Sequence, residues 1–126
     1  GYLGAGSEDG LMDIPDLRKV CEEFHVATED GSMGLKGNII GLLKSHGKQL
    51  ASCTHAYVCG PRGAMEAVAT YCDSLGLECQ VSLESVMACG IGTCLGCTCK
   101  TTHHTNYTRV CTEGPVFNSR EVIFRD

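Results

Sequence analysis

Residues 87–100 read MACGIGTCLGCTCK and place three cysteines, Cys89, Cys94 and Cys97, close together in the chain. A fourth cysteine, Cys111, follows later. The spacing Cys-x4-Cys-x2-Cys, completed by a more distant cysteine, is that of plant-type 2Fe-2S clusters, whose irons are held by thiolates. The pattern therefore predicts a one-electron redox centre with these four cysteines as its ligands.

Three glycines in this stretch would let the backbone curl around a metal. Gly90, Gly92 and Gly96 can adopt a positive φ without the steric penalty that a Cβ imposes. Small residues also let backbone N–H groups approach the cluster sulfurs, where such hydrogen bonds tune the reduction potential.

Three other uses of the cysteines stay open. A four-thiolate zinc site is the nearest competitor, although zinc modules usually carry two separated Cys-x2-4-Cys pairs, and here the second half holds only Cys111. Ten cysteines in 126 residues approach the density of a disulfide scaffold, but no basic, apolar leader is seen and the others lie singly in apolar patterns. The third use is a redox dithiol of Cys94 and Cys97, for which no helix N-terminus is evident to lower a thiol pKa.

Two further candidates for metal ligands lie after the cluster stretch. Cys99 competes with Cys111, but plant-type spacing puts the fourth ligand further along, so we expect Cys99 to be a small buried residue. The pair His103 and His104 could bind a metal, yet a solvated hairpin tip is the commoner explanation.

Composition indicates a compact domain, or two small ones, in a reducing cytoplasm. The chain is 43% hydrophobic with a net charge of -5, and its scattered Lys and Arg argue against nucleic-acid binding. No apolar run approaches the length that a membrane span needs. Many unpaired cysteines suit a reducing compartment.

Strands and helices alternate in the first two thirds of the sequence. The first helix would place Ile14, Leu17, Val20 and Cys21 on one face. The expected elements are a helix at 14–21, a strand at 25–28, a helix from 39 that stops at Gly47, a strand at 56–59, a helix at 64–75 and a strand at 78–83. This alternation predicts an α/β fold, a truncated Rossmann-like parallel sheet with right-handed crossovers.

The sequence changes character at about residue 84. Residues 97–101, 107–111 and 122–124 are expected to be short antiparallel strands around the predicted cluster loop. So small a segment cannot build a large core, so we expect the metal to be what makes it fold.

Two stretches near the C-terminus carry a family resemblance. Residues 87–100 and 110–117 (VCTEGPVF) closely resemble the C-terminal iron-sulfur domain of the electron transfer subunits of type B dihydroorotate dehydrogenase. Upstream, residues 27–37 (ATEDGSMGLKG) and 57–65 (YVCGPRGAM) resemble the nucleotide domain of the ferredoxin-NADP reductase superfamily. The resemblance covers nearly the whole chain.

The resemblance implies two domains and a function. Residues 1–83 would form a partial pyridine-nucleotide-binding domain, and residues 84–126 the 2Fe-2S domain. Subunits of this family pass electrons between NAD, FAD and the 2Fe-2S cluster and exchange them with an FMN-containing partner that oxidises dihydroorotate in pyrimidine biosynthesis. Alternatives are a reductase-like subunit of a hydrogenase or glutamate synthase-type enzyme, and a non-catalytic interaction module stabilised by zinc or a cluster.

The resemblance also implies two turns that face the nucleotide. Cys59-Gly60-Pro61 corresponds to the strand-end turn beside the nicotinamide ring, and Asp30-Gly31-Ser32 to a turn at the carboxyl end of a neighbouring strand, where open α/β sheets bind ligands. The alternative is that Gly and Pro only end a strand and form the turn into the next helix here, with no contact to a ligand.

The chain departs from the family at its N-terminus. The FAD-binding domain and the first strand of the nucleotide domain have no counterpart, and Gly4-Ala5-Gly6-Ser7 stands where relatives often have Gly-x-Arg, with no strand of useful length before it. The chain resembles a C-terminal fragment, which we expect not to be catalytic on its own.

The missing strand is the central one in the family's order 3-2-1-4-5, and its loss would leave open edges at 25–28 and 56–59. We expect this gap to close by pairing of those two strands, by insertion of the segment near Tyr2 and Leu3, or by self-association with a second copy.

Overall fold

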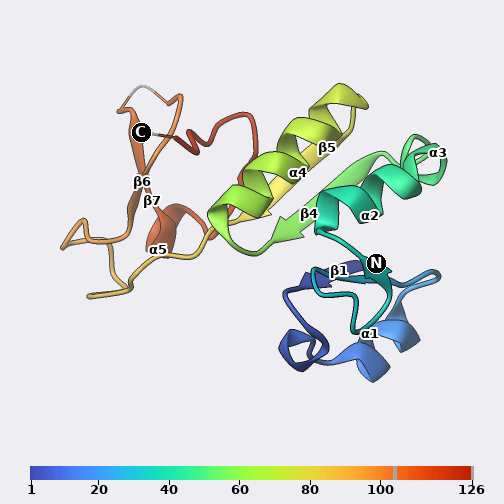
Figure 1. Cartoon of the computed structure of the whole chain (residues 1–126). Helices are drawn as coiled ribbons and strands as arrows, with labels where there is room; N and C mark the ends of the chain where they lie inside the picture. The colour runs from blue at the N-terminus through green and yellow to red at the C-terminus, as the bar shows by residue number, and fades with distance from the viewer. Residues whose placement is uncertain (104, 126) are drawn as a thin grey trace. The chain divides into compact units, whose positions relative to one another are not determined.

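The computed structural model describes residues 1–103 and 105–125 and divides the chain into two compact units, 1–52 and 53–126 (Figure 1). It confirms the α/β class, with parallel strands in both units and short antiparallel strands in the second. Among the described residues, no helix combines the length and apolar character needed to cross a bilayer.

Unit 1 is a three-stranded parallel sheet with short helices. Strand β2 lies in the middle, paired on one side with β1 and on the other with β3. The elements are β1 (Tyr2–Ala5), a 3-10 turn (Glu8–Gly10), α1 (Ile14–Val20), β2 (His25–Thr28), β3 (Leu35–Lys36), α2 (Ile39–Ser45) and α3 (Gly47–Leu50).

Helix α2 begins where the sequence predicts. The side chain of Asn38 caps it by accepting a hydrogen bond of 2.9 Å from the Gly41 N–H. Leu42 and Leu43 of α2 are buried, as are Val26 and Ala27 of β2, which α2 contacts. The core of unit 1 is therefore the packing of one helix on a central strand.

One expectation for unit 1 is wrong, namely that no strand of useful length precedes the Gly-rich segment. Residues 2–5 form a strand, because their backbone completes a parallel ladder with β2. Helix α1 is present at Ile14–Val20, but it buries none of its residues, and Val20 is 81% exposed.

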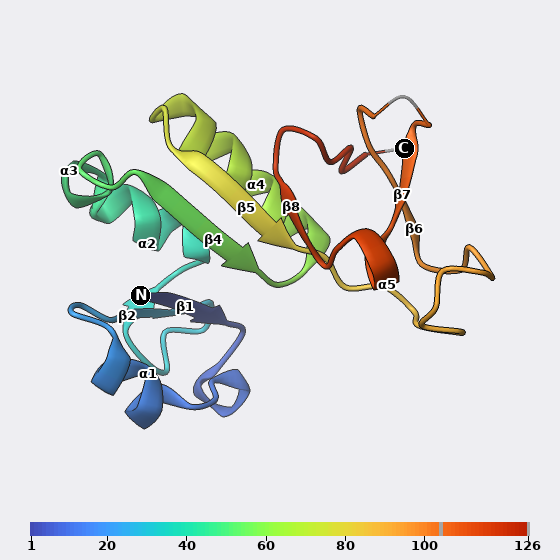
Figure 2. The ribbon, with the colours of Figure 1, turned by 180° about the vertical axis from the view of Figure 1, so that it is seen from behind.

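Unit 2 contains a second three-stranded sheet, β4-β5-β8, in which β8 runs antiparallel to β5. Helix α4 covers one face of this sheet (Figures 1 and 2) and buries Met65, Val68, Ala69 and Cys72. The elements are β4 (His55–Cys59), α4 (Arg62–Ser74), β5 (Glu78–Ser82) and β8 (Val116–Asn118). Phe117 of β8 is buried, which explains how the C-terminal segment joins this sheet.

The rest of unit 2 is a hairpin of β6 (Thr98–Lys100) and β7 (Tyr107–Arg109), followed by the helical turn α5 (Val110–Glu113). The strand expected at 107–111 therefore ends at Arg109, where the Glu113 carboxylate accepts the Arg109 backbone N–H and closes a turn instead. The strand expected at 122–124 is reduced to one bridge between Thr101 and Val122, and β8 was not expected.

One of the three expected routes for closing the sheet is confirmed, since the segment at Tyr2 and Leu3 pairs with β2. Within unit 2, β4 pairs with β5 at the end of the order β4-β5-β8 and is the edge strand of that sheet. Pairing of 25–28 with 56–59, which would join the two units, stays a prediction.

Candidate metal centre

The predicted cysteine ligands lie on three segments of unit 2. Cys89 and Cys94 are in the loop between β5 and β6, Cys97 directly precedes β6, and Cys111 is on α5. The loop needs glycine at Gly92, because φ there is +79° and an added Cβ would lie 3.0 Å from Thr112 Cγ2.

Cys97 and Cys111 form one pair. The Cys111 backbone N–H donates to Cys97 Sγ at 3.4 Å, and the Val110 N–H donates to the Cys97 carbonyl at 3.1 Å. The N–H and thiol of Cys111 lower the pKa of Cys97, while the Cys97 sulfur raises the pKa of Cys111. Cys97 is buried, so this pair is anchored at the start of the hairpin.

Cys89 and Cys94 form a second pair within the loop. Backbone N–H groups of Cys94 and Ile91, together with the Cys94 thiol, lower the pKa of Cys89 to about 5. The Gly96 N–H donates to Cys94 Sγ at 3.4 Å. Each pair therefore combines two sulfurs with backbone N–H donors, and one cysteine of each pair, Cys89 or Cys97, has a lowered pKa.

Two cysteine pairs are the protein donors that a 2Fe-2S cluster needs, since each of its two irons takes two cysteine sulfurs. Within the described residues, no group of three or more His, Cys, Asp or Glu side chains is gathered tightly enough to hold a single metal ion. In the part of the chain that the structure describes, no two cysteines form a disulfide. The donor set and its N–H groups thus fit the predicted cluster, and the assignment of its ligands stays a prediction.

Cys99 lies on β6 and is half-buried, less completely than expected. Burial raises the pKa of its thiol, in contrast to Cys89 and Cys97. Cys99 therefore lacks the lowered pKa that Cys89 and Cys97 share.

An ion pair that the sequence pattern did not predict lies beside Cys111. Arg109 Nη2 is 2.9 Å from Glu113 Oε1, and Glu113 Oε2 also accepts the Thr108 hydroxyl at 2.9 Å. The guanidinium and the Arg109 N–H lower the pKa of Glu113 to about 2. The spacing of Arg109 and Glu113 on either side of Cys111 was the available signal in the sequence.

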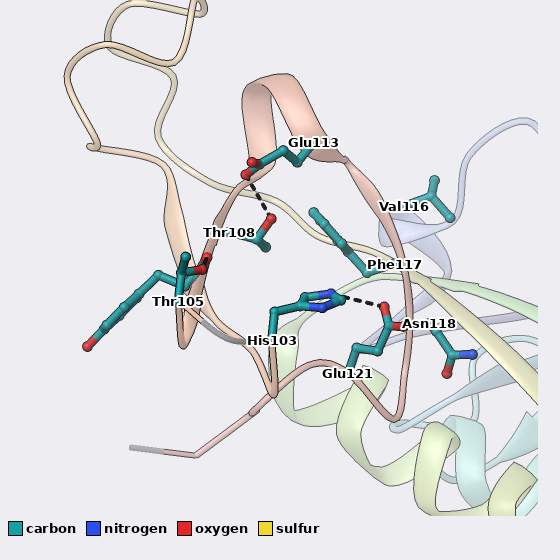
Figure 3. A pocket seen from close by; sticks show the side chains of 9 residues that line it. His103, Thr105, Thr108, Glu113, Val116, Phe117, Asn118 and Glu121 are labelled. Atoms are coloured by element: carbon teal, nitrogen blue, oxygen red, sulfur yellow. Dashed lines mark hydrogen bonds and ion pairs between the residues drawn. The ribbon is translucent and has the colours of Figure 1, made fainter.

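Glu113 also lines a pocket of about 410 Å³ (Figure 3). His103, from the predicted hairpin tip, points toward Glu121, and the distance from His103 Nε2 to Glu121 Oε2 is 3.5 Å. His104, the other half of the predicted pair, lies outside the described residues. The remaining lining residues are Thr105, Tyr107, Thr108, Val116, Phe117 and Asn118.

The two predicted nucleotide turns lie in different units. In unit 1, Asp30 accepts the Ser32 N–H at 2.9 Å and the Ser32 hydroxyl at 2.6 Å, and these bonds lower the pKa of Asp30. In unit 2, Cys59 and Pro61 flank Gly60 at the start of α4, where φ of Gly60 is +146°. The nucleotide contacts of both turns stay predictions.

The cluster loop exposes large apolar side chains. Ile91 is 71% exposed and Leu95 60% exposed, and Val86 and Met87 precede them. Leu95 also has a φ of +58°, which is unusual for a residue with a Cβ. An apolar surface of this kind around a metal loop is typical of a protein contact.

Comparison with known proteins supports the family resemblance. Residues 84–123 match the family model of the iron-sulfur cluster binding domain of dihydroorotate dehydrogenase B. The chain is 37% identical over 98% of its length to the electron transfer subunit of dihydroorotate dehydrogenase B (NAD(+)) from Desulforamulus reducens, and covers 47% of that protein. It is 40% identical over 81% of its length to the same subunit of Caldanaerobacter subterraneus, of which it covers 41%. The chain thus spans less than half of these curated relatives.

A solved structure shares the fold. The NADH-dependent reduced ferredoxin-NADP oxidoreductase, studied for flavin-based electron bifurcation, has a TM-score of 0.75 and 25% identity over 98% of this chain and 43% of its own. The relationship to reductase-like electron transfer proteins is therefore confirmed in both sequence and fold.

Proposed function

We propose that this chain binds a 2Fe-2S cluster and serves as part of an electron transfer subunit of type B dihydroorotate dehydrogenase. The observation that carries the proposal is the gathering of Cys89 with Cys94 and of Cys97 with Cys111, inside the segment that matches the iron-sulfur family. When bound, the cluster would accept and release one electron at a time. Cys89 and Cys94 would hold one iron, and Cys97 and Cys111 the other.

The backbone around the cysteines supports this role. The N–H groups of Gly96 and Cys111 already point at cysteine sulfurs, where they would spread the negative charge of a reduced cluster. Residues 84–126 are the proposed cluster domain and residues 1–83 the proposed partial nucleotide domain. The location we propose is the cytoplasm, in keeping with described cysteines that form no disulfide.

The partner we propose is an FMN-containing dihydroorotate dehydrogenase catalytic subunit. Ile91 and Leu95, exposed on the cluster loop, offer an apolar contact surface close to the cluster ligands. Docking of this loop on the flavoprotein would then bring the cluster close to the FMN.

The nicotinamide and flavin roles belong to the longer protein that the relatives represent. We assign Cys59-Gly60-Pro61 and Asp30-Gly31-Ser32 to nucleotide contacts, and FAD to a domain outside this chain. NAD(H), FAD and the cluster would then form one electron path to or from the partner.

We further propose that edge strand β4 pairs with another strand, supplied by a second copy of this chain when it is isolated. Tyr57 of β4 is 75% exposed, and an edge strand of a parallel sheet invites pairing. Sedimentation at increasing concentration should show a monomer–dimer equilibrium, and a monomer throughout would argue against the proposal.

A second candidate keeps the electron transfer and changes the partner. The fold match to a ferredoxin-NADP oxidoreductase favours a reductase-like subunit of another iron-sulfur flavoenzyme. Titrating reduced, cluster-loaded chain into an FMN-containing dihydroorotate dehydrogenase catalytic subunit decides between them. Stoichiometric binding and reoxidation of the cluster support the first candidate, and no binding supports the second.

A further inference from the structure

We infer that Arg109 is a positioning residue: held by Glu113, it fixes Gly92 of the cluster loop against the helical turn that carries Cys111, and it thereby sets the reduction potential of the cluster. The inference rests on the proposed cluster and deepens it, because it assigns a role to an ion pair outside the ligand set.

Glu113 is held in place from strand β7. Its Oε2 accepts the Arg109 backbone N–H at 2.6 Å and the Thr108 hydroxyl at 2.9 Å, as Figure 3 shows for Thr108. Its Oε1 lies 2.9 Å from Arg109 Nη2. The side chains of the pair are 41% and 44% exposed, and the carboxylate holds the guanidinium because it also accepts hydrogen bonds from Thr108 and from the Arg109 backbone.

Arg109 reaches from this anchor to the loop that carries the other cysteine pair. Its Nη1 donates to the Gly92 carbonyl at 3.4 Å, across 17 positions of sequence. Gly92 lies between Cys89 and Cys94 in the sequence, so the contact ties the loop with one cysteine pair to the hairpin with the other.

Gly92 also lies close to α5. An added Cβ would lie 3.0 Å from Thr112 Cγ2 and 3.4 Å from Arg109 Nη1, which shows how closely the two segments approach. Residue 92 therefore lies between the guanidinium and the helical turn that carries the predicted ligand Cys111.

This link would act on the cluster through charge. A reduced cluster carries one more negative charge than an oxidised one, and both an N–H donor to sulfur and a nearby guanidinium stabilise that charge. Loosening Gly92 should therefore shift the midpoint potential to more negative values.

The test is a redox titration of cluster-loaded protein, followed by electron paramagnetic resonance. Arg109→Gln should shift the midpoint potential to more negative values. Arg109→Lys keeps the charge and loses the planar fork, so a positioning role predicts a negative shift here too. The control is Arg120→Gln, which removes the same charge from an ion pair with Asp73 and should leave the potential unchanged.

The variant Glu113→Gln distinguishes a positioning role of Arg109 from a direct effect of charge on the reduction potential. Removing a carboxylate near the cluster should raise the potential if only charge matters, whereas loss of the anchor for Arg109 should lower it. A positive shift in Glu113→Gln, or an unchanged potential in loaded Arg109→Lys, would overturn the inference and leave the proposed function intact. Zinc without sulfide in the unsubstituted protein would overturn both.

Discussion

The backbone N–H of Cys111 lies 3.4 Å from the sulfur of Cys97, although 14 positions separate the two residues. The contact places α5 against the start of β6, and the Val110 N–H reinforces it by donating to the Cys97 carbonyl. A cysteine pair is therefore built from both ends of the hairpin. Binding of metal to this pair would stabilise the hairpin itself, which couples the cluster to folding.

Replacing any one of Cys89, Cys94, Cys97 and Cys111 by Ala should abolish the cluster and destabilise unit 2. We expect a loss of more than about 3 kcal/mol in the free energy of unfolding, since the metal contributes to folding. Visible absorption and urea denaturation measure the two effects. Cys99→Ala is the matched control, and loss of colour in that variant would reassign the fourth ligand.

A charge at Gly96 should slow electron transfer to the partner and leave the cluster unchanged. An added Cβ there would lie 3.4 Å from Cys94 Sγ, an ordinary contact, so Gly96→Glu should fold. Burying an unpaired carboxylate in an apolar interface is unfavourable. Stopped-flow reduction of the flavoprotein gives the rate. Gly6→Glu, where an added Cβ meets no atom within 4 Å, is the control; equal rates in both variants would point to another docking face.

Gly34→Ala should destabilise unit 1. Gly34 has a φ of +71°, and an added Cβ would collide with the carbonyl oxygen of Val26 in the central strand β2. The expected cost is more than about 2 kcal/mol, measured by chemical denaturation. Gly41→Ala, in helix α2, should instead gain up to about 1 kcal/mol. Equal stability of the two variants would contradict the backbone conformation at residue 34.

Ser32→Ala should raise the pKa of Asp30. In the folded chain the Ser32 hydroxyl and N–H stabilise the carboxylate, so its pKa lies below the ordinary value. The stabilisation is present above the unfolded pKa and is lost as the pH falls through the folded pKa. A carbon-detected nuclear magnetic resonance titration measures the change. Ser52→Ala, which removes a hydroxyl bonded to Gln49, should leave the Asp30 titration as it is.

Local sequence patterns predicted the elements whose own residues carry the signal. The apolar run that begins at residue 39 marks α2, and the apolar stripe at 64–75 marks α4. Both helices are present, with bounds close to those expected.

Elements that depend on distant partners were harder to predict. Strand β1, expected only as one of three ways to close the sheet, exists because Leu3 pairs with Val26, and the unexpected β8 exists because Phe117 pairs with Val81. Neither segment has the alternating pattern of a strand that is stable alone. The same limit applied to the metal centre, where cysteine spacing predicted the ligands but could not show that Arg109 reaches back to the cluster loop.

The most direct test of the central claim is the iron, sulfide and zinc content of anaerobically purified protein, combined with its electron paramagnetic resonance spectrum. The four predicted ligands should bind about two irons and two sulfides per chain, and reduction by one electron should give a rhombic signal. Stoichiometric zinc without sulfide, and no such signal, would contradict the claim that Cys89, Cys94, Cys97 and Cys111 hold a 2Fe-2S cluster.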